Sequence, residues 1–296
     1  MVPNAPGGGY DTTARVVAQV AEDEGLTGHI EVFNLEGASG VVGLARTAHE
    51  DGNAHLMMMM GLGVVGALFA TESGVRLDQV TPIARLISEP EVVVVPRGSR
   101  FENLEELIRA WVARPGLIRV GGGSSAGGPD HLAAHLLADA VGIDSPQVRY
   151  RQYDGGGPLL AAMFAGRVDF AVSGVGEYVD HIANGEVTVL AVTSAERVDG
   201  LEAPTLRELG VPLEFTNWRG LVAPPGLTPR DERSLIDLVT RLHETDGWRN
   251  AERRYGWADG LLTGAEFGAF LHKESARVAA VLRDLGFTRD PAPASH

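Results

Sequence analysis

The stretch GGGSSAGGPDH, residues Gly121–His131, predicts the fold of this chain. Ile118–Val120 before it is typical of a short strand, and His131–Val141 after it has the apolar spacing of a helix. Three other segments repeat this plan of an extended or loop segment, a glycine cluster and an amphipathic helix. Their glycine clusters are Pro6–Asp11, Gly37–Gly40 and Asp154–Gly157. The repetition predicts an α/β architecture with mainly parallel sheets, in which ligands bind beyond the carboxyl ends of the strands.

Further apolar runs and periodic segments fill in this architecture. The predicted strands outside the opening unit are Ile30–Phe33, Leu56–Met60, Glu91–Val95, Val148–Tyr153, Phe170–Val172, Val187–Val192 and Leu221–Ala223. The other predicted helices are Thr12–Glu24, Val41–Glu50, Pro158–Ala165, Pro229–His243 and Ala265–Leu285. The C-terminal third is therefore expected to be mostly helical.

Two apolar stretches with Pro and Gly at their ends are expected to cross between lobes. They are Glu91–Ser99 and Asn217–Gly226. If the chain leaves one lobe at the first and returns at the second, residues 1–97 and 219–296 form a discontinuous lobe 1. Residues 98–218 then form an inserted lobe 2, which is a hinged arrangement.

Composition excludes several classes of function. With 25 basic and 39 acidic residues, the formal net charge of −14 disfavours nucleic acid and anionic membrane surfaces as partners. The sequence has no Cys, no Walker phosphate-binding motif and no run of 18 apolar residues, so thiol chemistry, such a nucleotide site and membrane insertion are not expected. His131 and His135 are spaced i, i+4, but no third ligand is linked to them by a motif, which favours a helix face over a metal site. We expect no metal and no cofactor.

The opening stretch allows two enzymatic interpretations. Gly123–Gly127 fits G-x-S-x-G, so Ser125 could be a hydrolase nucleophile, with Asp169 and His181 completing a triad. This pattern arises easily in a chain with 38 Gly, and the sequence has no H-G-G-G oxyanion motif. The alternative is a tight turn of small residues before a helix.

The second enzymatic interpretation is a dinucleotide-binding turn. Gly121, Gly123 and Ala126 fit G-x-G-x-x-A. That motif also requires an acid about 20 residues further on, at the end of the next strand. Asp139 lies inside the predicted helix and Asp144 precedes the next strand, so the spacing disfavours a nucleotide.

The repeated glycine loops favour binding over catalysis. A loop that opens a helix exposes unpaired backbone N–H groups and the positive end of the helix dipole. Several such ends that converge on one cleft would bind a carboxylate without a cationic side chain. The favourable potential would be confined to the cleft, which is compatible with an acidic surface.

The order of the motifs resembles the substrate-binding proteins of tripartite tricarboxylate transporters, the Bug family of periplasmic receptors. The matching segments, from residue 3 to about 229, are Pro6–Asp11 with Ala14 and Arg15, Asn34–Gly40 with Gly43, Asp51–Gly52, Gly122–Ala133, Tyr153–Pro158, Gly166–Asp169, Leu190–Ser194 with Arg197, Pro204–Gly210 and Trp218–Gly226. Each segment is weak by itself, and nine in order are specific.

The resemblance implies a two-lobe, type II periplasmic-binding-protein (Venus-flytrap) fold that closes on a ligand in the cleft between its lobes. It implies a non-enzymatic receptor that delivers a small carboxylate to a two-component membrane permease. A di- or tricarboxylate is expected, with an amino acid or an aromatic acid as alternatives; a serine hydrolase using Ser125 is the enzymatic alternative. An extracytoplasmic location is also implied, with the signal peptide removed, and a lipid anchor on the full-length precursor is compatible with it.

The resemblance also suggests which residues line the cleft. The expected ligand-binding residues are Gly9, Tyr10, Asp11, Ser39, Gly40, Ser124, Ser125, Gly127, His131, Gly155, Gly156, Ser173 and Gly174. Within this set, Asp11 is expected to cap its helix and His131 to hydrogen-bond the loop rather than the ligand. Asp169 is expected to be structural, and core packing is the default for Trp218.

Two positions depart from the family pattern towards negative charge. Asp154 stands where the family often has Lys, and Glu36 stands where a basic or Pro-containing sequence is common. These changes leave the ligand open and are compatible with a ligand that carries a cation, such as an amino acid.

Overall fold

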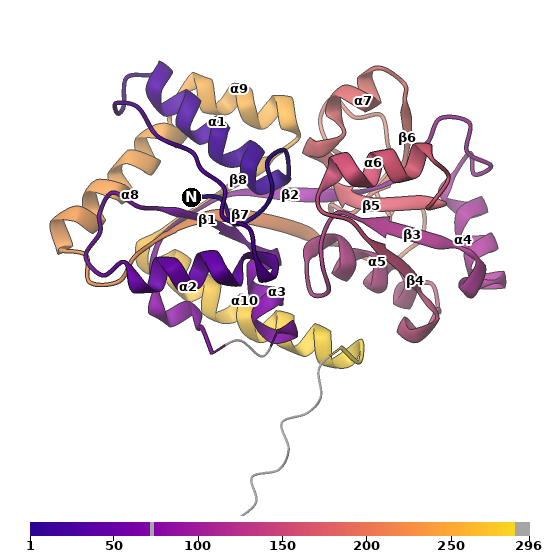
Figure 1. The fold of residues 1–296 in the computed structure, drawn as a ribbon. Coiled ribbons are helices and arrows are strands. Elements are labelled where there is room, and N and C mark those ends of the chain that lie inside the picture. Colours follow the sequence, from indigo (N-terminus) through magenta and orange to yellow (C-terminus); the bar gives the residue numbers. More distant parts are fainter. Residues whose placement is uncertain (72–73, 288–296) are drawn as a thin grey trace, which may run out of the picture.

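A computed structural model describes residues 1–71 and 74–287 of the chain. Figure 1 shows a mixed α/β structure of two lobes joined by long strands. The strands are β1 (Met58–Gly61), β2 (Thr81–Pro96), β3 (Arg119–Gly122), β4 (Arg149–Gln152), β5 (Phe170–Gly174), β6 (Val187–Val192), β7 (Thr216–Ala223) and β8 (Ala258–Thr263). The helices are α1 (Gly9–Asp23), α2 (Val41–His49), α3 (Leu62–Ala70), α4 (Leu104–Ala113), α5 (Pro129–Ala140), α6 (Gly156–Phe164), α7 (Val179–Ala183), α8 (Pro229–His243), α9 (Asp246–Tyr255) and α10 (Gly264–Asp284).

The 16-residue strand β2 organises both lobes. Residues from Thr81 to Pro90 pair with β7, and part of the same segment pairs with β8. From Glu91 onward β2 pairs instead with β5 and β6. The change of partners between Pro90 and Glu91 therefore marks where this strand passes from one group of elements to the other. The lobe boundaries 1–97, 98–218 and 219–296 stay a prediction.

The prediction of mainly parallel sheets is wrong. Only β3 with β4 and β3 with β5 are parallel pairs among the named strands of the described chain. The strands β5, β6, β7 and β8 all run antiparallel to β2, and β1 runs antiparallel to β7. The reason is that one long strand with a direction opposite to its neighbours lies at the centre of the strand order β1-β7-β2-β5-β3-β4.

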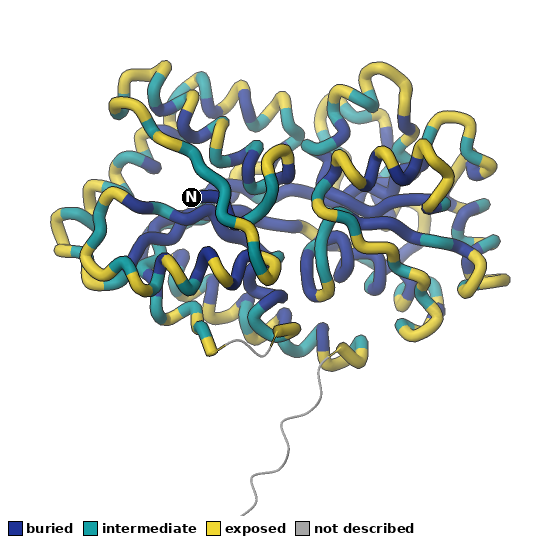
Figure 2. The backbone as a smooth tube through the Cα atoms, viewed as in Figure 1, coloured by how far each residue is buried: buried dark blue, intermediate teal, exposed yellow. Residues whose placement is uncertain are grey.

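Hydrophobic side chains cover both faces of the sheet. Alternate residues of β2 point to opposite sides, so Val93 and Val95 pack in the cluster that contains α4 and α5. Val92 and Val94 pack in the cluster that contains α6 and Tyr178. The dark blue strands in Figure 2 lie inside the surrounding helices, whose outward faces are exposed. This fully apolar valine run is the part of β2 that the sequence predicts.

Each of the four glycine clusters is followed by a helix, as predicted. One of the strands predicted before these clusters is absent from the described part of the chain. The predicted strand Ile30–Phe33 is not a strand; Asn34, next to it, makes only an isolated bridge with Val2. This segment crosses the surface half-exposed and gains no ladder of backbone hydrogen bonds. Its helix α2 still begins where the glycine cluster ends.

Candidate ligand-binding site

A cavity of about 260 Å³ is lined by loops from both lobes. Its lining residues are Pro3, Asn4, Ala5, Gly9, Tyr10, Glu36, Gly37, Ser39, Gly63, Gly123, Ser124, Ser125, Gly128, Pro129, Asp130, Gln152, Tyr153, Asp154, Gly155, Glu177 and Arg219. Ligand pockets are commonly about 300–1,000 Å³, and this cavity lies just below that range, which suits a ligand of few atoms.

Helix N-termini surround this cavity. Gly9 begins α1, Ser39 lies in the turn before α2, Pro129 begins α5 and Gly155 precedes α6, and all four line the cavity. The first N–H groups of a helix have no partner inside it and carry the positive end of its dipole. The convergence predicted from the glycine clusters is therefore present in the structure.

Ser39 and Ser125 join the two lobes across the mouth of the cavity. Their hydroxyl oxygens are 2.6 Å apart and form a hydrogen bond. Ser39 has φ 54°, a left-handed conformation that is uncommon for a residue other than Gly.

We call Ser39, Ser124, Ser125 and Gly155 the loop face of the cavity.

The backbones of the two lobes also touch at two glycines. A Cβ added to Gly66 of α3 would lie 1.9 Å from the carbonyl oxygen of Gly127. Gly127 has φ +83°, which favours glycine. These two residues permit an approach that any side chain at position 66 would prevent.

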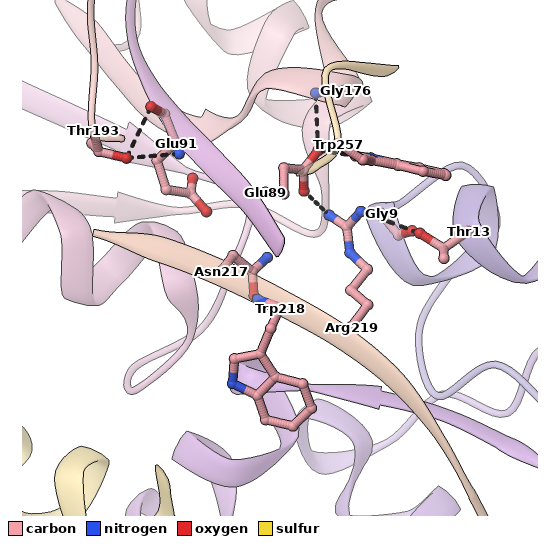
Figure 3. Close-up of polar contacts among 10 residues, drawn as sticks. All are labelled: Gly9, Thr13, Glu89, Glu91, Gly176, Thr193, Asn217, Trp218, Arg219 and Trp257. Atoms are coloured by element: carbon pink, nitrogen blue, oxygen red, sulfur yellow. Dashed lines mark hydrogen bonds and ion pairs between the residues drawn. The ribbon is translucent and has the colours of Figure 1, made fainter. Parts of the chain in front are cut away.

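A buried ion pair lies beside the cavity, as Figure 3 shows. The guanidinium of Arg219, which is 4% exposed and lines the cavity, donates to the fully buried carboxylate of Glu89. Arg219 also donates to the hydroxyl of Thr13 at 3.2 Å. Glu89 further accepts from the backbone N–H of Gly176 at 2.9 Å and from the indole of Trp257 at 3.3 Å. Glu89 thereby connects β2, β7 and the turn after β5.

Three more acids surround this pair. Asp130 is 5% exposed and accepts from the backbone N–H of Gly123 at 2.7 Å. Burial, together with the charge of Asp130, raises the pKa of Glu177 to about 8, and burial also raises the pKa of Asp130 itself. Burial and the neighbouring acids raise the pKa of Glu91 well above its usual value. We call Glu89, Glu91, Asp130, Glu177 and Arg219 the charge cluster.

Six of the predicted ligand-binding residues line the cavity together, namely Gly9, Tyr10, Ser39, Ser124, Ser125 and Gly155. The hydroxyl of Tyr10 accepts from the backbone N–H of Val64 at 3.3 Å. The hydroxyl of Ser124 accepts from the backbone N–H of His131, also at 3.3 Å. Contact between these residues and a ligand stays a prediction.

The other seven predicted residues lie outside the cavity lining. Asp11 accepts from the backbone N–H of Gly7, from Arg15 and from Asn34, so it fixes the first glycine loop. His131 accepts at Nδ1 from the backbone N–H of Gly127 at 3.3 Å, which is the loop contact that the sequence favoured. Its burial lowers its pKa to about 3.

The remaining four residues lie next to lining residues or their helices but do not line the cavity themselves. Gly40 precedes α2 with φ 99°. Gly156 packs against Glu177, and Gly174 packs against Glu89. Ser173 is buried in β5 at 1% exposure. Glycine at positions 156 and 174 permits close packing of these two acids, whereas Gly40 packs against Val64 and Pro3.

The three residues of the hydrolase alternative do not form a triad through the hydrogen bonds of the described chain. Ser125 bonds to Ser39, and Asp169 accepts from both the backbone and the side chain of Arg119. His181 bonds to Glu186. Ser125 thus has a serine as its partner rather than a base that could activate it.

Arg219, Glu177, Asp130 and Glu89 were missed as site residues by the sequence reasoning. Arg219 stands in the motif Trp218–Gly226, directly after Trp218. Trp218 is buried, donates to Glu274 at 3.1 Å and packs against Phe267 and Phe270, so it belongs to the core. The signal that could have found Arg219 is an arginine within a largely apolar stretch. Charged residues are rarely buried unless they are paired, so such a residue indicates a buried ion pair.

Among the residues that the structure describes, one group outside the cavity brings together side chains of the types that bind metal ions. His243, Glu252 and Asp259 place one ligand atom each within 4.8 Å of one another. The same atoms have protein partners: Trp248 donates to Glu252 and the backbone N–H of Leu261 donates to Asp259. His243 and Asp259, 2.9 Å apart, are accordingly explained as a partly exposed ion pair.

None of the helices in residues 1–71 and 74–287 is sufficiently long and apolar to cross a membrane.

Comparisons with known proteins converge on one family. Residues 13–286 match the model of the tripartite tricarboxylate transporter family receptor, TctC. A UPF0065 protein in the tcbD-tcbE intergenic region of Pseudomonas sp. strain P51 is 34% identical over 78% of this chain and 68% of its own length. Protein BugT of Bordetella pertussis is 27% identical over 97% of this chain and 88% of its own.

Solved structures show the same fold. MatC from Rhodopseudomonas palustris with bound malate has a TM-score of 0.81 at 24% identity, covering 95% of this chain and 97% of its own. Rpa4515 of R. palustris with adipate has a TM-score of 0.85 at 23% identity, covering 96% of each chain. The two-lobe periplasmic-binding-protein fold expected from the sequence is confirmed.

Proposed function

Because the chain belongs to the tripartite tricarboxylate transporter receptor family, we propose that it captures a small organic carboxylate and delivers it to a two-component membrane permease. The observation that carries the first part is the convergence of four helix N-termini on one cavity. Backbone N–H groups at such ends bind carboxylates. The family is one of solute-binding receptors, which supports a receptor over an enzyme.

The ligand proposed from the resemblance is a di- or tricarboxylate, with an amino acid or an aromatic acid as alternatives. The malate and adipate in two proteins of the same fold are small dicarboxylates. The cavity of about 260 Å³ is compatible with molecules of that size.

Closure of the two lobes would retain the ligand. The hydrogen bond between Ser39 and Ser125 and the contact of Gly66 with Gly127 join the lobes at the cavity mouth. Opening would break these contacts while β2 and β7 act as the hinge. The closed shape would then be the form that the permease recognises, with the lobes divided as 1–97 and 219–296 against 98–218.

The proposed location is extracytoplasmic, as the family consists of periplasmic receptors. A lipid anchor on the precursor is an alternative to a freely diffusing protein.

Calorimetric titration with succinate, citrate, glutamate and terephthalate tests the proposal. We expect saturable binding of at least one of these carboxylates, and silence across the whole panel would contradict a carboxylate receptor. Delivery is tested separately, by uptake of the bound carboxylate into vesicles that contain the permease. A receptor should be required for that uptake.

The hydrolase alternative has its own test. A serine-reactive phosphonate labels only an activated serine. We expect no label on Ser125, whose hydroxyl bonds to Ser39. Stoichiometric labelling detected by mass spectrometry would instead favour the enzyme.

A further inference from the structure

The charged residues that line the cavity expected to bind an anion are mainly acids. These residues are Glu36, Asp130, Asp154 and Glu177 against the single cation Arg219. Arg219 is already paired with Glu89. A ligand with two or three carboxylates would therefore meet helix N-termini but no uncompensated cationic side chain within the lining.

The carboxyl group of Glu177 lies among the helix ends themselves. A Cβ on Gly156 would be 2.2 Å from its Oε2, which places this oxygen against the first residue of α6. A hydrogen bond from the backbone N–H of Gly9, the first residue of α1, favours its ionised form. A carboxylate of the chain itself thus takes the place that one carboxylate of a polyanionic ligand would need.

Two oxygen atoms of the lining residues also lack donors. Glu177 Oε2 and Asn4 Oδ1 are buried, and neither accepts a hydrogen bond from any residue that the structure describes. A buried acceptor without a partner is costly, so a ligand that donates hydrogen bonds to it gains affinity. An ammonium group is such a donor, whereas a carboxylate is not.

We propose that the ligand is an amino monocarboxylate whose ammonium group donates to Glu177 and whose carboxylate accepts from the helix N-termini and from Ser124 of the loop face. This inference rests on the proposed function and narrows it. One molecule then satisfies both kinds of group: the donors of the loop face and the acceptors of the charge cluster. A second carboxylate in place of the ammonium would oppose the ionisation of Glu177 and would gain no charge pair with it.

The protonation of Glu177 gives this inference a second readout. The groups that act on its charge are Asp130 of α5, Arg219 of β7, Glu89 and Glu91 of β2 and Tyr178 beside it. With a pKa of about 8, Glu177 is mostly protonated at pH 7. An ammonium group favours the ionised form, so its binding should release a proton. A carboxylate in the same place should instead retain or take up a proton.

Matched ligands that differ only at one end test the inference. The pairs are 4-aminobutyrate with succinate, 5-aminopentanoate with glutarate, and 6-aminohexanoate with adipate, titrated by calorimetry at pH 7. We expect the amino member of the best-fitting pair to bind at least about tenfold more tightly than its dicarboxylate, as charged hydrogen bonds contribute about that much. Titration in buffers of different ionisation enthalpy measures the proton released.

The variant Glu177→Gln separates the role of this side chain from general effects on the fold. It should weaken the amino ligand by about tenfold or more, abolish the proton release and strengthen the dicarboxylate. Asp180→Asn is the matched control, since this exposed acid lies three residues after Glu177 but outside the cavity lining. It should change either affinity by less than about threefold, as expected for an exposed charge.

The outcomes distinguish this inference from the function on which it rests. Tighter binding of the dicarboxylates, with Glu177→Gln leaving the preference unchanged, would overturn the inference and leave a carboxylate receptor. Binding of an amino member without proton release would also overturn the role of Glu177. Silence for all six compounds would overturn the inference, and silence for the carboxylate panel as well would overturn the proposed function.

Discussion

The loop face and the charge cluster meet at one cavity but are built in opposite ways. The loop face consists of short, partly exposed turns whose donors are backbone amides and the serines Ser124 and Ser125. The charge cluster consists of four buried side chains from β2, α5 and β7 and the half-buried Glu177 from the turn after β5. The conformation of the loop face is determined by local sequence. The charge cluster instead forms only when segments far apart in the chain meet, such as those of Glu89 and Arg219. We therefore expect the loop face to bind one end of the ligand and the charge cluster also to stabilise the fold.

The largest effect should come from removing the only cation of the cluster. Arg219→Ala would leave Glu89 fully buried without its ionic partner. Breaking a buried pair costs about 3–5 kcal/mol, so we expect the free energy of unfolding to fall by about that amount. Urea denaturation followed by circular dichroism measures it.

Two variants calibrate this result. Arg207→Ala removes an exposed ion pair with Glu214 and should cost about 0–1 kcal/mol. The double variant Arg219→Met with Glu89→Met removes both charges and should recover much of the loss. If Arg219→Ala were no worse than Arg207→Ala, the cluster would not be a buried unit on which the fold depends.

The same contrast explains what the sequence could predict. Glycine clusters followed by helical spacing predict α1, α2, α5 and α6 because turn and helix signals are local. The six predicted residues that line the cavity all lie in these turns or in the first turn of the helix that follows. Glu177 and Arg219 lie in no such pattern, and their proximity follows from strand pairing across the chain.

Strand β2 shows the same limit in the fold. The valine run at Glu91–Val95 predicts a strand, while Pro82, Pro90 and Glu89 argue against extending it. In the structure the strand continues through both prolines: a register shift against β7 adjoins Pro82, and Pro90 lies where β2 changes its partner from β7 to β5. The polar Glu89 is tolerated there because Arg219, Gly176 and Trp257 supply its partners.

The second largest effect should come from separating the lobes at the loop side of the cavity. Gly66→Ala would place a Cβ 1.9 Å from the carbonyl oxygen of Gly127, although alanine itself favours helix α3. The lobes must then move apart at this point. We expect affinity for the best carboxylate to fall by about tenfold or more, equivalent to about 1.4 kcal/mol. Small-angle scattering should show a larger radius of gyration.

Gly157→Ala is the control for this change. Gly157 also lies in a helix, α6, but a Cβ there would have no atom within 4 Å. Its affinity and scattering should match the wild type. Unchanged affinity and radius for Gly66→Ala would show that the contact between α3 and the second lobe has no part in closure.

A smaller effect, and one that depends on pH, is expected at Glu91. Both carboxyl oxygens of this buried residue lack hydrogen-bond partners among the described residues, and burial raises its pKa well above the usual value. The unfolded chain releases this proton near pH 4.5 and the folded chain only at higher pH, so stability is lost as pH rises between the two. The glutamine of Glu91→Gln has no proton to lose. We therefore expect the variant to gain roughly 1 kcal/mol in free energy of unfolding at pH 8, which corresponds to a melting temperature about 2–4 °C above that of the wild type.

The pH dependence is the decisive part of that experiment. The advantage of Glu91→Gln should disappear at about pH 3.5, below the pKa of the unfolded carboxyl, because the wild-type group is then mostly protonated in both states. The exposed Glu266→Gln serves as the control and should show no such trend. If the melting temperature of Glu91→Gln exceeded that of the wild type by the same amount at both pH values, better packing rather than removal of a buried charge would be the cause.

The smallest effect is expected at the loop face, where a single hydroxyl pair joins the lobes. Ser125→Ala removes the 2.6 Å hydrogen bond to Ser39 without a cost of buried charge. The net value of a neutral hydrogen bond is about 0.5–1.5 kcal/mol, so affinity should fall only about twofold to tenfold. Ser39→Ala should have a similar effect, and the double variant should be little worse than either single one, because all three remove the same bond. Fully additive losses would mean that each serine contacts the ligand independently, and the loop face would then bind by its separate donors rather than by closing on itself.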